Sequence, residues 1–207
     1  MSVKNYKFYN TSLGWIHFFI ALITFSLTVE PTASFWDAGE YIATSAKLQV
    51  GHPPGAPLFQ MIGAFFAMFA PNVEKVALFV NLMSVFSSAF TILFMFWTLT
   101  LILRKLPAFK NINTKSDYIG FFGSASIGSL AFCFSDSFWF NAVEAEVYAM
   151  ATLILSVLFW LGLKWEQEMN TAYGDRWLLL ISFIIGLSFG VHFMGLLTIP
   201  AIGMLYY

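Results

Sequence analysis

Long apolar stretches alternate with short polar segments along the chain, which is the pattern of a protein that crosses a membrane several times. Residues 76–103 contain no charged side chain, and a helix of these 28 residues would be about 42 Å long. About 17–25 apolar residues are enough to span a bilayer. We therefore predict membrane-spanning helices at 13–29, 76–103, 118–134, 147–163 and 177–191, followed by a last apolar stretch at 196–207.

A shorter apolar segment, residues 57–70, decides how these helices alternate across the membrane. Its 14 residues favour an interfacial or re-entrant helix over a span. If the segment does not cross, eight Lys and Arg residues lie on the side of the amino terminus, and only Lys47 and Lys75 lie on the other side. This positive-inside bias predicts a cytoplasmic amino terminus. The outer face is then formed by 30–75, 135–146 and the turn around His192.

The composition supports a membrane protein and excludes several other classes. Of 207 residues, 59% are hydrophobic and 10% are charged, whereas a soluble domain has about 25% charged residues. The net charge of −1 and the lack of a Lys/Arg run indicate no nucleic-acid partner. The single cysteine, Cys133, excludes an intrachain disulfide.

The predicted fold class is an all-α polytopic membrane protein surrounded by a lipid bilayer. We expect one transmembrane domain over 1–207, with a first span at 13–29, an outer loop with interfacial helices at 30–75, and further spans over 76–207. The last apolar stretch has no polar segment after it. We therefore expect the chain to be the amino-terminal part of a longer protein.

Acidic residues and histidines from distant parts of the chain gather on the predicted outer face. Asp37 and Glu40 follow the first span, and the rigid turn His52-Pro53-Pro54-Gly55 comes next; Glu144, Glu146 and His192 lie in the later outer segments. A polar cavity at the lipid–water boundary would be built in this way. One of its carboxylates could act as a general base while a lipid-linked phosphate leaves.

Other chemistries fit the residue pattern less well. The histidines and carboxylates do not have the spacing of a zinc hydrolase, and the cytoplasmic segments contain no Gly-rich phosphate loop. We assign no metal ligand and expect no cofactor. An oxygen-ligated Mg²⁺ or Mn²⁺ stays conceivable if the carboxylates at 37, 40, 144 and 146 converge.

The same polar residues also allow a purely structural interpretation. Asp37 and Glu40 have the spacing of a capping box, with Gly51 as the residue that would end the helix. Asn141 and Glu144 repeat this spacing before the apolar stretch at 147–163. Pro53-Pro54 would then only stiffen a turn.

Four motifs together resemble one family of membrane proteins. They are Trp36-Asp37-Ala38-Gly39-Glu40, Gly51-His52-Pro53-Pro54-Gly55-x-Pro57-Leu58, Asn81-x-Met83-Ser84 and Glu144-x-Glu146-x-Tyr148-Ala149. The chain resembles, from about residue 13 to its end, the amino-terminal part of the family catalogued as domain of unknown function 2723, which includes protein O-mannosyltransferases. It is also similar to the wider GT-C class of polytopic glycosyltransferases.

This resemblance implies an activity and a set of site residues. The implied reaction moves a sugar from a polyprenyl-phosphate donor to a hydroxyl of a protein or glycan acceptor on the non-cytoplasmic side. The implied catalytic residues are Asp37 and Glu40. The implied substrate-binding residues are His52, Asn81, Glu144, Glu146, Tyr148 and His192.

The chain departs from this pattern in one respect, and two other functions stay open. A donor phosphate needs a cation or a ring of N–H donors, and only Lys47 and Lys75 lie on the predicted outer face.

The alternatives are a non-catalytic subunit of a larger membrane or envelope complex and a proton- or cation-coupled transporter. We expect the bacterial inner membrane as the location, with the active site on the periplasmic side.

Overall fold

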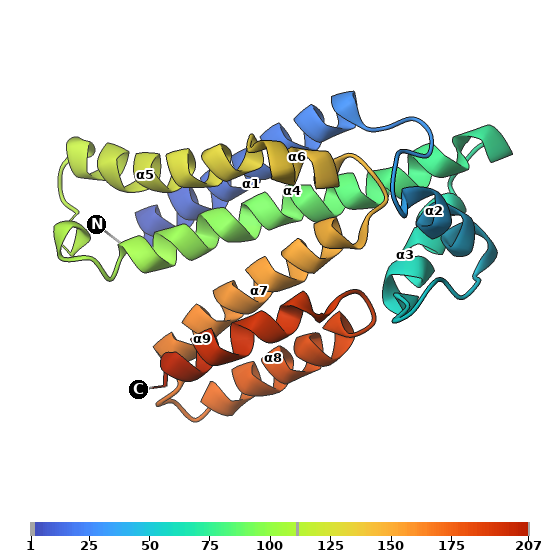
Figure 1. Cartoon of the computed structure of the whole chain (residues 1–207). Coiled ribbons are helices and arrows are strands. Elements are labelled where there is room, and N and C mark those ends of the chain that lie inside the picture. The colour runs from blue at the N-terminus through green and yellow to red at the C-terminus, as the bar shows by residue number, and fades with distance from the viewer. Residues whose placement is uncertain (1–2, 111, 207) are drawn as a thin grey trace.

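The computed structural model describes residues 3–110 and 112–206, and this part of the chain is all helical, with no strand (Figure 1). Three helices are long and apolar enough to cross a membrane: α1 (Val3–Thr28), α4 (Val76–Leu103) and α7 (Val147–Glu168). The protein is therefore an all-α polytopic membrane protein, as the hydrophobic pattern predicts. Of the predicted last stretch, residue 207 lies outside the described residues.

Helix α4 is the central element of the bundle. It packs against α1, α7 and α5 (Lys115–Cys133), which lie around it in Figure 1. The most apolar window of α4 is 61% buried inside the protein, compared with 28% for α1 and 44% for α7. A helix that is apolar on all sides is stable where neighbours or lipid surround it, which explains why residues 76–103 carry no charge.

The later apolar stretches form helices whose bounds differ from the predicted ones. Helix α5 meets α6 (Asp136–Ala142) at 65°, so this pair counts as one broken span at most. Helix α8 (Gly174–Ser188) has 15 residues, and the last stretch is divided into η3 (Phe193–Leu197) and α9 (Thr198–Met204). The predicted span at 177–191 is placed three residues too late, because the chain leaves α8 before Gly190, whose carbonyl accepts the backbone N–H groups of Leu58 and Phe59.

Two short helices cover the outer end of the bundle. They are α2 (Ala38–Lys47) and α3 (Pro57–Ala67), and a 3-10 turn, η1 (Val73–Lys75), leads from α3 into α4. Helix α3 has 11 residues, so it is too short to span, as predicted for this segment. Its exposed apolar residues include Met61, Phe65 and Met68, which suits a helix lying at a lipid boundary.

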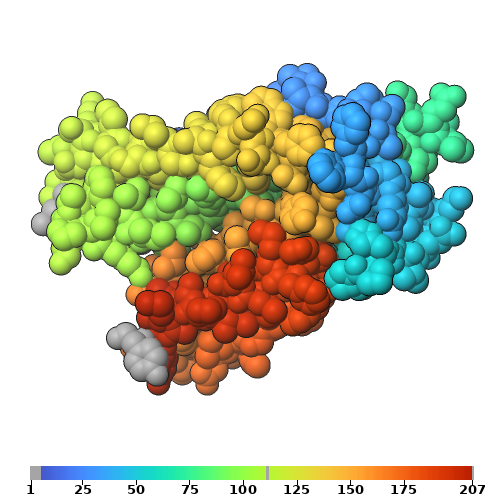
Figure 2. Space-filling view, viewed as in Figure 1, coloured from blue at the N-terminus to red at the C-terminus, as the bar shows by residue number. Residues whose placement is uncertain are grey.

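The outer segments meet at one end of the molecule. In Figure 1 both chain ends lie at the opposite end from α2 and α3, together with η2 (Pro107–Phe109) in the loop between α4 and α5. The space-filling view shows the segment around α2 and α3 in contact with the later part of the chain near α8 and η3 (Figure 2). This arrangement is the one that a non-crossing α3 requires.

The membrane topology can be tested with an impermeant thiol reagent. Cysteines introduced at the exposed positions Val50 and Ser137 should react from the outside, and one at Asn113 should not. The native Cys133 is buried and provides a silent background. Labelling of Asn113→Cys from the outside would show that α3 crosses the membrane and that the outer face is wrongly placed.

Candidate active site

The first outer loop is attached to the segment that precedes α7. The backbone N–H of Glu30 donates to the carbonyl of Val143 at 2.9 Å, and the hydroxyl of Ser34 donates to the carboxylate of Glu144. Further along, the carboxylate of Glu146 lies close to the backbone N–H of Asp37. Contacts at three positions of the loop, Glu30, Ser34 and Asp37, therefore hold residues 30–37 against residues 143–146, which are more than a hundred positions away in the sequence.

Asn81, on α4, supports the first outer loop through hydrogen bonds to its backbone. Its side chain is fully buried on α4, and its amide nitrogen donates to the carbonyls of Glu30 at 2.6 Å and Thr32 at 2.9 Å. Buried carbonyl groups need such donors because leaving them unpaired costs free energy. The structure places Asn81 beneath the loop and not in the wall of the cavity described below.

Asp37, Glu40 and His52 form a cluster at the start of α2. The Oε1 atom of Glu40 accepts the backbone N–H of His52 at 2.6 Å, and its Oε2 atom lies 3.1 Å from Nδ1 of the same residue. The other ring nitrogen of His52, Nε2, lies 3.9 Å from Oδ2 of Asp37. The expectation that Asp37 or Glu40 lies close to another outer-face residue is confirmed for His52.

The turn after His52 gives this cluster its geometry. The backbone N–H of Gly55 donates to the carbonyl of His52 at 2.8 Å, and Gly55 has a φ of 81°. Glycine adopts this left-handed conformation without the steric penalty that other residues have. The His-Pro-Pro-Gly sequence thus closes a tight turn that presents the His52 ring to α2.

The capping interpretation of these residues is wrong. Asp37 stands at the N-cap position of α2, but its side chain makes no capping hydrogen bond. The helix ends at Leu48, with a φ of 49°, and not at Gly51. Asn141 lies within α6, and the N-cap of α7 is Glu146, again without a capping hydrogen bond from its side chain. Tertiary partners occupy these carboxylates instead.

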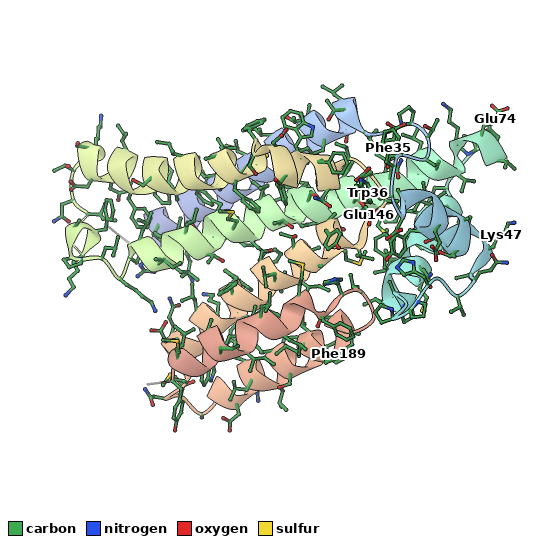
Figure 3. The ribbon with its side chains drawn as sticks, in the orientation of Figure 1. Phe35, Trp36, Lys47, Glu74, Glu146 and Phe189 are labelled. Atoms are coloured by element: carbon green, nitrogen blue, oxygen red, sulfur yellow. The ribbon has the colours of Figure 1, made fainter. Side chains whose placement is uncertain are left out.

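A polar cavity of about 300 Å³ joins the cluster to the later outer segments. Its wall includes two residues from the start of α7 and His192 from the turn after α8. Figure 3 shows Glu146 and Phe189 on the two later segments that face α2. The lining residues with polar side chains are Asp37, Tyr41, His52, Glu146, Tyr148 and His192. Sequence reasoning missed Tyr41, whose only signal was its place one residue after Glu40.

Glu146 is a buried carboxylate in this wall. Only 6% of the residue is exposed, and its carboxylate lies close to the backbone N–H groups of Asp37 and Val147. Burial raises the pKa of Glu146 to about 7, and the nearby charges of Glu144 and Asp37 act in the same direction. A charge in a poorly solvated place is unfavourable, so the neutral form is favoured.

Glu144 is buried behind the cavity wall and does not line it. The residue is 2% exposed, and its Oε1 atom has no hydrogen-bond partner within the described residues. Burial raises the pKa of Glu144, while the hydrogen bond from Ser34 acts in the opposite direction. Its geometry is that of a support for the first outer loop.

His192, unlike His52, has a backbone N–H group as its hydrogen-bond partner. His192 accepts the backbone N–H of Met194 through Nδ1 at 3.2 Å, so this nitrogen carries no proton and Nε2 is the N–H donor. His192 also lies against Tyr148, with ring centroids 5.4 Å apart.

Burial raises the pKa of Tyr41 to about 12, so its hydroxyl stays protonated and can donate a hydrogen bond.

The cations of the outer face lie outside this cavity. No Lys or Arg belongs to its wall within the described part of the chain. Figure 3 shows Lys47 on the outer edge of α2, away from Glu146. A negative ligand would therefore find N–H and O–H donors of histidine and tyrosine here, beside the carboxylates of Asp37 and Glu146.

Asp37, Glu40 and His52 also have the residue types of a metal site. One ligand atom from each lies within 4.8 Å of the others, and all three residues are exposed. The hypothesis of an Mg²⁺ or Mn²⁺ site made of the carboxylates at 37, 40, 144 and 146 does not fit this arrangement. Glu144 is bound to Ser34, and both oxygens of Glu40 face His52.

Fold and site together define a class: a helical membrane protein with a carboxylate- and histidine-lined cavity at one membrane face. A family model described as "Protein O-mannosyl-transferase TMEM260 N-terminal domain" matches residues 37–207. The chain belongs to this family. It is 27% identical over 195 residues to the protein O-mannosyl-transferase tmem260 of Dictyostelium discoideum, covering 88% of this chain and 22% of the relative.

A second relative is similar over a comparable range. It is the protein O-mannosyl-transferase TMEM260 of Mus musculus, 26% identical over 164 residues, with 79% of this chain and 21% of the relative covered. The chain thus spans about a fifth of the length of these relatives. No solved structure matches the chain.

The buried carboxylate of Glu146 should make stability depend on pH. Because folding raises its pKa from 4.5 to about 7, the native state binds this proton more tightly than the unfolded state does. Its contribution to stability is complete below about pH 4.5 and is lost as the pH rises through about 7. The melting temperature in detergent should therefore be higher at pH 5.5 than at pH 8, and Glu146→Gln should reduce this difference. An unchanged difference in Glu146→Gln, or the same reduction in the exposed control Glu74→Gln, would contradict this assignment.

The role of Asn81 as a support can be measured separately. Asn81→Ala leaves the carbonyls of Glu30 and Thr32 without their donor, and we expect the free energy of unfolding to fall by about 1–3 kcal/mol. The control is Asn141→Ala, because the amide of Asn141 bonds at the surface to Ser137 within the same helix. Equal melting temperatures for both variants would show that Asn81 does not support the loop.

Proposed function

We propose that this domain transfers a sugar from a polyprenyl-phosphate donor to a hydroxyl of a protein on the non-cytoplasmic side of the membrane. The observation that carries the proposal is the position of Asp37, an exposed carboxylate at the edge of a polar cavity, beside an apolar groove. The relatives are named protein O-mannosyl-transferases, which supports mannose as the sugar and a protein as the acceptor.

In this reaction Asp37 acts as the general base. The acceptor hydroxyl oxygen forms a bond to the anomeric carbon of the sugar while the bond from that carbon to the phosphate oxygen breaks. The phosphate leaves with the electron pair, and the hydroxyl proton moves to the carboxylate of Asp37. Glu40 is less suited to this role because both of its oxygens face His52.

The apolar groove supports a donor with a lipid chain. It has a volume of about 380 Å³ and lies between α3, α4, α7 and α8. Its wall includes Leu58, Ile62, Phe86, Met150 and Leu187. A groove with such a lining favours a hydrocarbon chain over a polar ligand because a polar group would find few hydrogen-bond partners there.

The groove and the polar cavity lie next to each other. The start of α7 contributes Tyr148 to the cavity and Met150 to the groove, and the end of α8 contributes Leu187 to the groove and leads to Val191 in the cavity. The hydrogen bond from Leu58 N–H to the Gly190 carbonyl, 2.8 Å long, lies on the boundary. A ligand with a polar head and an apolar chain could occupy both.

The donor phosphate would meet neutral donors in the cavity. His192 presents Nε2–H, and Tyr41 and Tyr148 present hydroxyl groups. Hydrogen bonds of this kind can hold an oxyanion. Within the described residues, these donors could bind the phosphate in place of Lys and Arg, which are scarce on the outer face.

The transporter hypothesis has less support. A proton or cation pathway needs ionisable groups buried within the spans. Among the described residues, the buried carboxylates are Glu144 and Glu146, and both lie before the first residue of α7. His17 is buried within α1, where its Nδ1 atom lies 2.7 Å from the carbonyl of Leu13 in the same helix. Neither carboxylate stands along a path through the bilayer.

The catalytic assignment of Asp37 can be separated from a structural one. Because its side chain makes no capping hydrogen bond, Asp37→Asn and Asp37→Ala should both fold and unfold like the wild type. Both should lose transfer by roughly 10²–10⁴-fold, which is the usual contribution of a general base. The measurement is transfer of labelled mannose from polyprenyl-phosphate mannose to protein in membranes that contain the chain.

Asp136→Asn serves as the matched control. Asp136 is an exposed carboxylate in the first turn of α6, outside the wall of the cavity. Full activity of a well-expressed Asp37→Asn variant would end the catalytic assignment. Wild-type membranes without transfer would favour the non-catalytic subunit.

A further inference from the structure

We propose that His52 works as an imidazolium that positions Asp37, and that Glu40 is the anchor that holds this imidazolium in place. The inference deepens the proposed function, on which it rests, because it reassigns two residues of the same site. His52 becomes a positioning residue and not a substrate contact, and Glu40 is not a second base.

The geometry of His52 leaves both ring nitrogens facing carboxylates. Nδ1 lies 3.1 Å from Oε2 of Glu40, and Nε2 lies 3.9 Å from Oδ2 of Asp37. A neutral imidazole has only one N–H group, so one of its nitrogens would turn a lone pair toward a negative charge. The doubly protonated ring offers an N–H group to each carboxylate.

Glu40 fixes where this ring stands. Besides the Nδ1 contact, its Oε1 atom accepts the backbone N–H of His52 at 2.6 Å. A carboxylate that binds both the main chain and the ring of one residue restricts its rotation. Because Glu40 lies in the first turn of α2, three residues after the N-cap residue Asp37, the pair connects the His-Pro-Pro-Gly turn to the start of the helix at which the base stands.

Asp37 needs such a partner. More than half of its side chain, 57%, is exposed, and it makes no capping hydrogen bond to the backbone of α2. An exposed carboxylate can adopt several rotamers, and a general base acts only within hydrogen-bond reach of the proton that it removes. The imidazolium of His52 selects the orientations of Asp37 that point toward it.

The groups around His52 favour its charged form. The hydrogen bond to Glu40 raises the pKa of His52, and the charges of Glu40, Asp37 and Glu146 act in the same direction. Conversely, the contacts with His52 lower the pKa of Glu40. The other titratable groups that line the same cavity are Tyr41, Tyr148 and His192.

His192 provides an internal contrast. Its Nδ1 atom accepts the backbone N–H of Met194, so Nε2 is the nitrogen that is left to donate. The two histidines of the cavity therefore have different partners on Nδ1, a backbone N–H for His192 and a carboxylate for His52. Their partners decide the difference, since a backbone N–H requires a lone pair and a carboxylate requires a proton.

The inference predicts a specific dependence of the transfer rate on pH. His52 is charged below its raised pKa and loses the proton as the pH rises through that value, so activity should fall on the alkaline side. Glu40→Gln removes the main cause of the raised pKa. The alkaline fall should therefore begin at a lower pH in Glu40→Gln, and its kcat should recover at about pH 6 or below.

His52→Gln tests the positioning itself. We expect kcat to fall about 10²-fold, which is the effect of a small misplacement of a catalytic group, while KM for the lipid donor changes little. The control is Glu74→Gln, an exposed glutamate on the outer face that should keep both the rate and its pH profile. A merely structural role would change the amount of folded protein but not the position of the alkaline fall.

Three results would overturn the inference. The first is an alkaline fall at the same pH in Glu40→Gln and in the wild type. The second is a His52→Gln variant in which KM for the donor rises while kcat is kept, because His52 would then be a substrate contact. Loss of activity on addition of a chelator, restored by Mg²⁺ or Mn²⁺ but not in His52→Gln, would make His52 a metal ligand and would overturn it as well.

A pH titration of His52, which needs no transfer activity, separates this inference from the proposed function. If wild-type membranes show no transfer, the proposed function fails, but the charge of His52 can still be followed by NMR of the ¹⁵N-histidine-labelled protein in detergent. His52, assigned by its absence in His52→Gln, should titrate above about 6.5, and lower in Glu40→Gln. The same titration point in both proteins would show that Glu40 does not hold the imidazolium.

Discussion

The structure of the outer face depends on one constraint: two carboxylates of a single short segment are buried where they bind the first outer loop. Glu144 accepts the hydroxyl of Ser34, and the carboxylate of Glu146 lies close to the backbone N–H of Asp37. Burying a carboxylate is unfavourable unless partners compensate. Because the loop provides those partners, residues 30–37 and 143–146 hold each other in place, and Asp37 is held at the edge of the cavity.

The membrane bundle provides the platform for this attachment. Helix α4 packs against α1, α5 and α7, and Asn81 on α4 binds the loop that leaves α1. The short helices α2 and α3 then lie across the outer end of the bundle. A polar cavity and an apolar groove share this end, and the boundary between them runs past the hydrogen bond of Leu58 to Gly190. A ligand that is polar at one end and apolar at the other matches this division.

Much of the architecture could be predicted from the hydrophobic pattern. The uncharged stretch 76–103 became α4, and 147–163 lies within α7, since a long apolar stretch in lipid must satisfy its backbone internally and so forms a helix. The stretch at 177–191 was predicted three residues too late along the chain, since α8 is Gly174–Ser188. Nothing in its apolar composition shows that the chain must leave α8 before Gly190 so that this carbonyl can meet α3.

The sequence by itself determined the class of protein, the shortness of α3 and the set of polar residues that gather at one end of the bundle. Each follows from local composition, or from counting charges between spans. Only the tertiary structure decided the use of these residues. Glu40 and Asp37 have the spacing of a capping box, yet Glu40 binds His52 and the side chain of Asp37 makes no capping hydrogen bond. Backbone N–H groups and side chains from distant segments compete for the same carboxylate, and the sequence alone does not show which of them lies within reach.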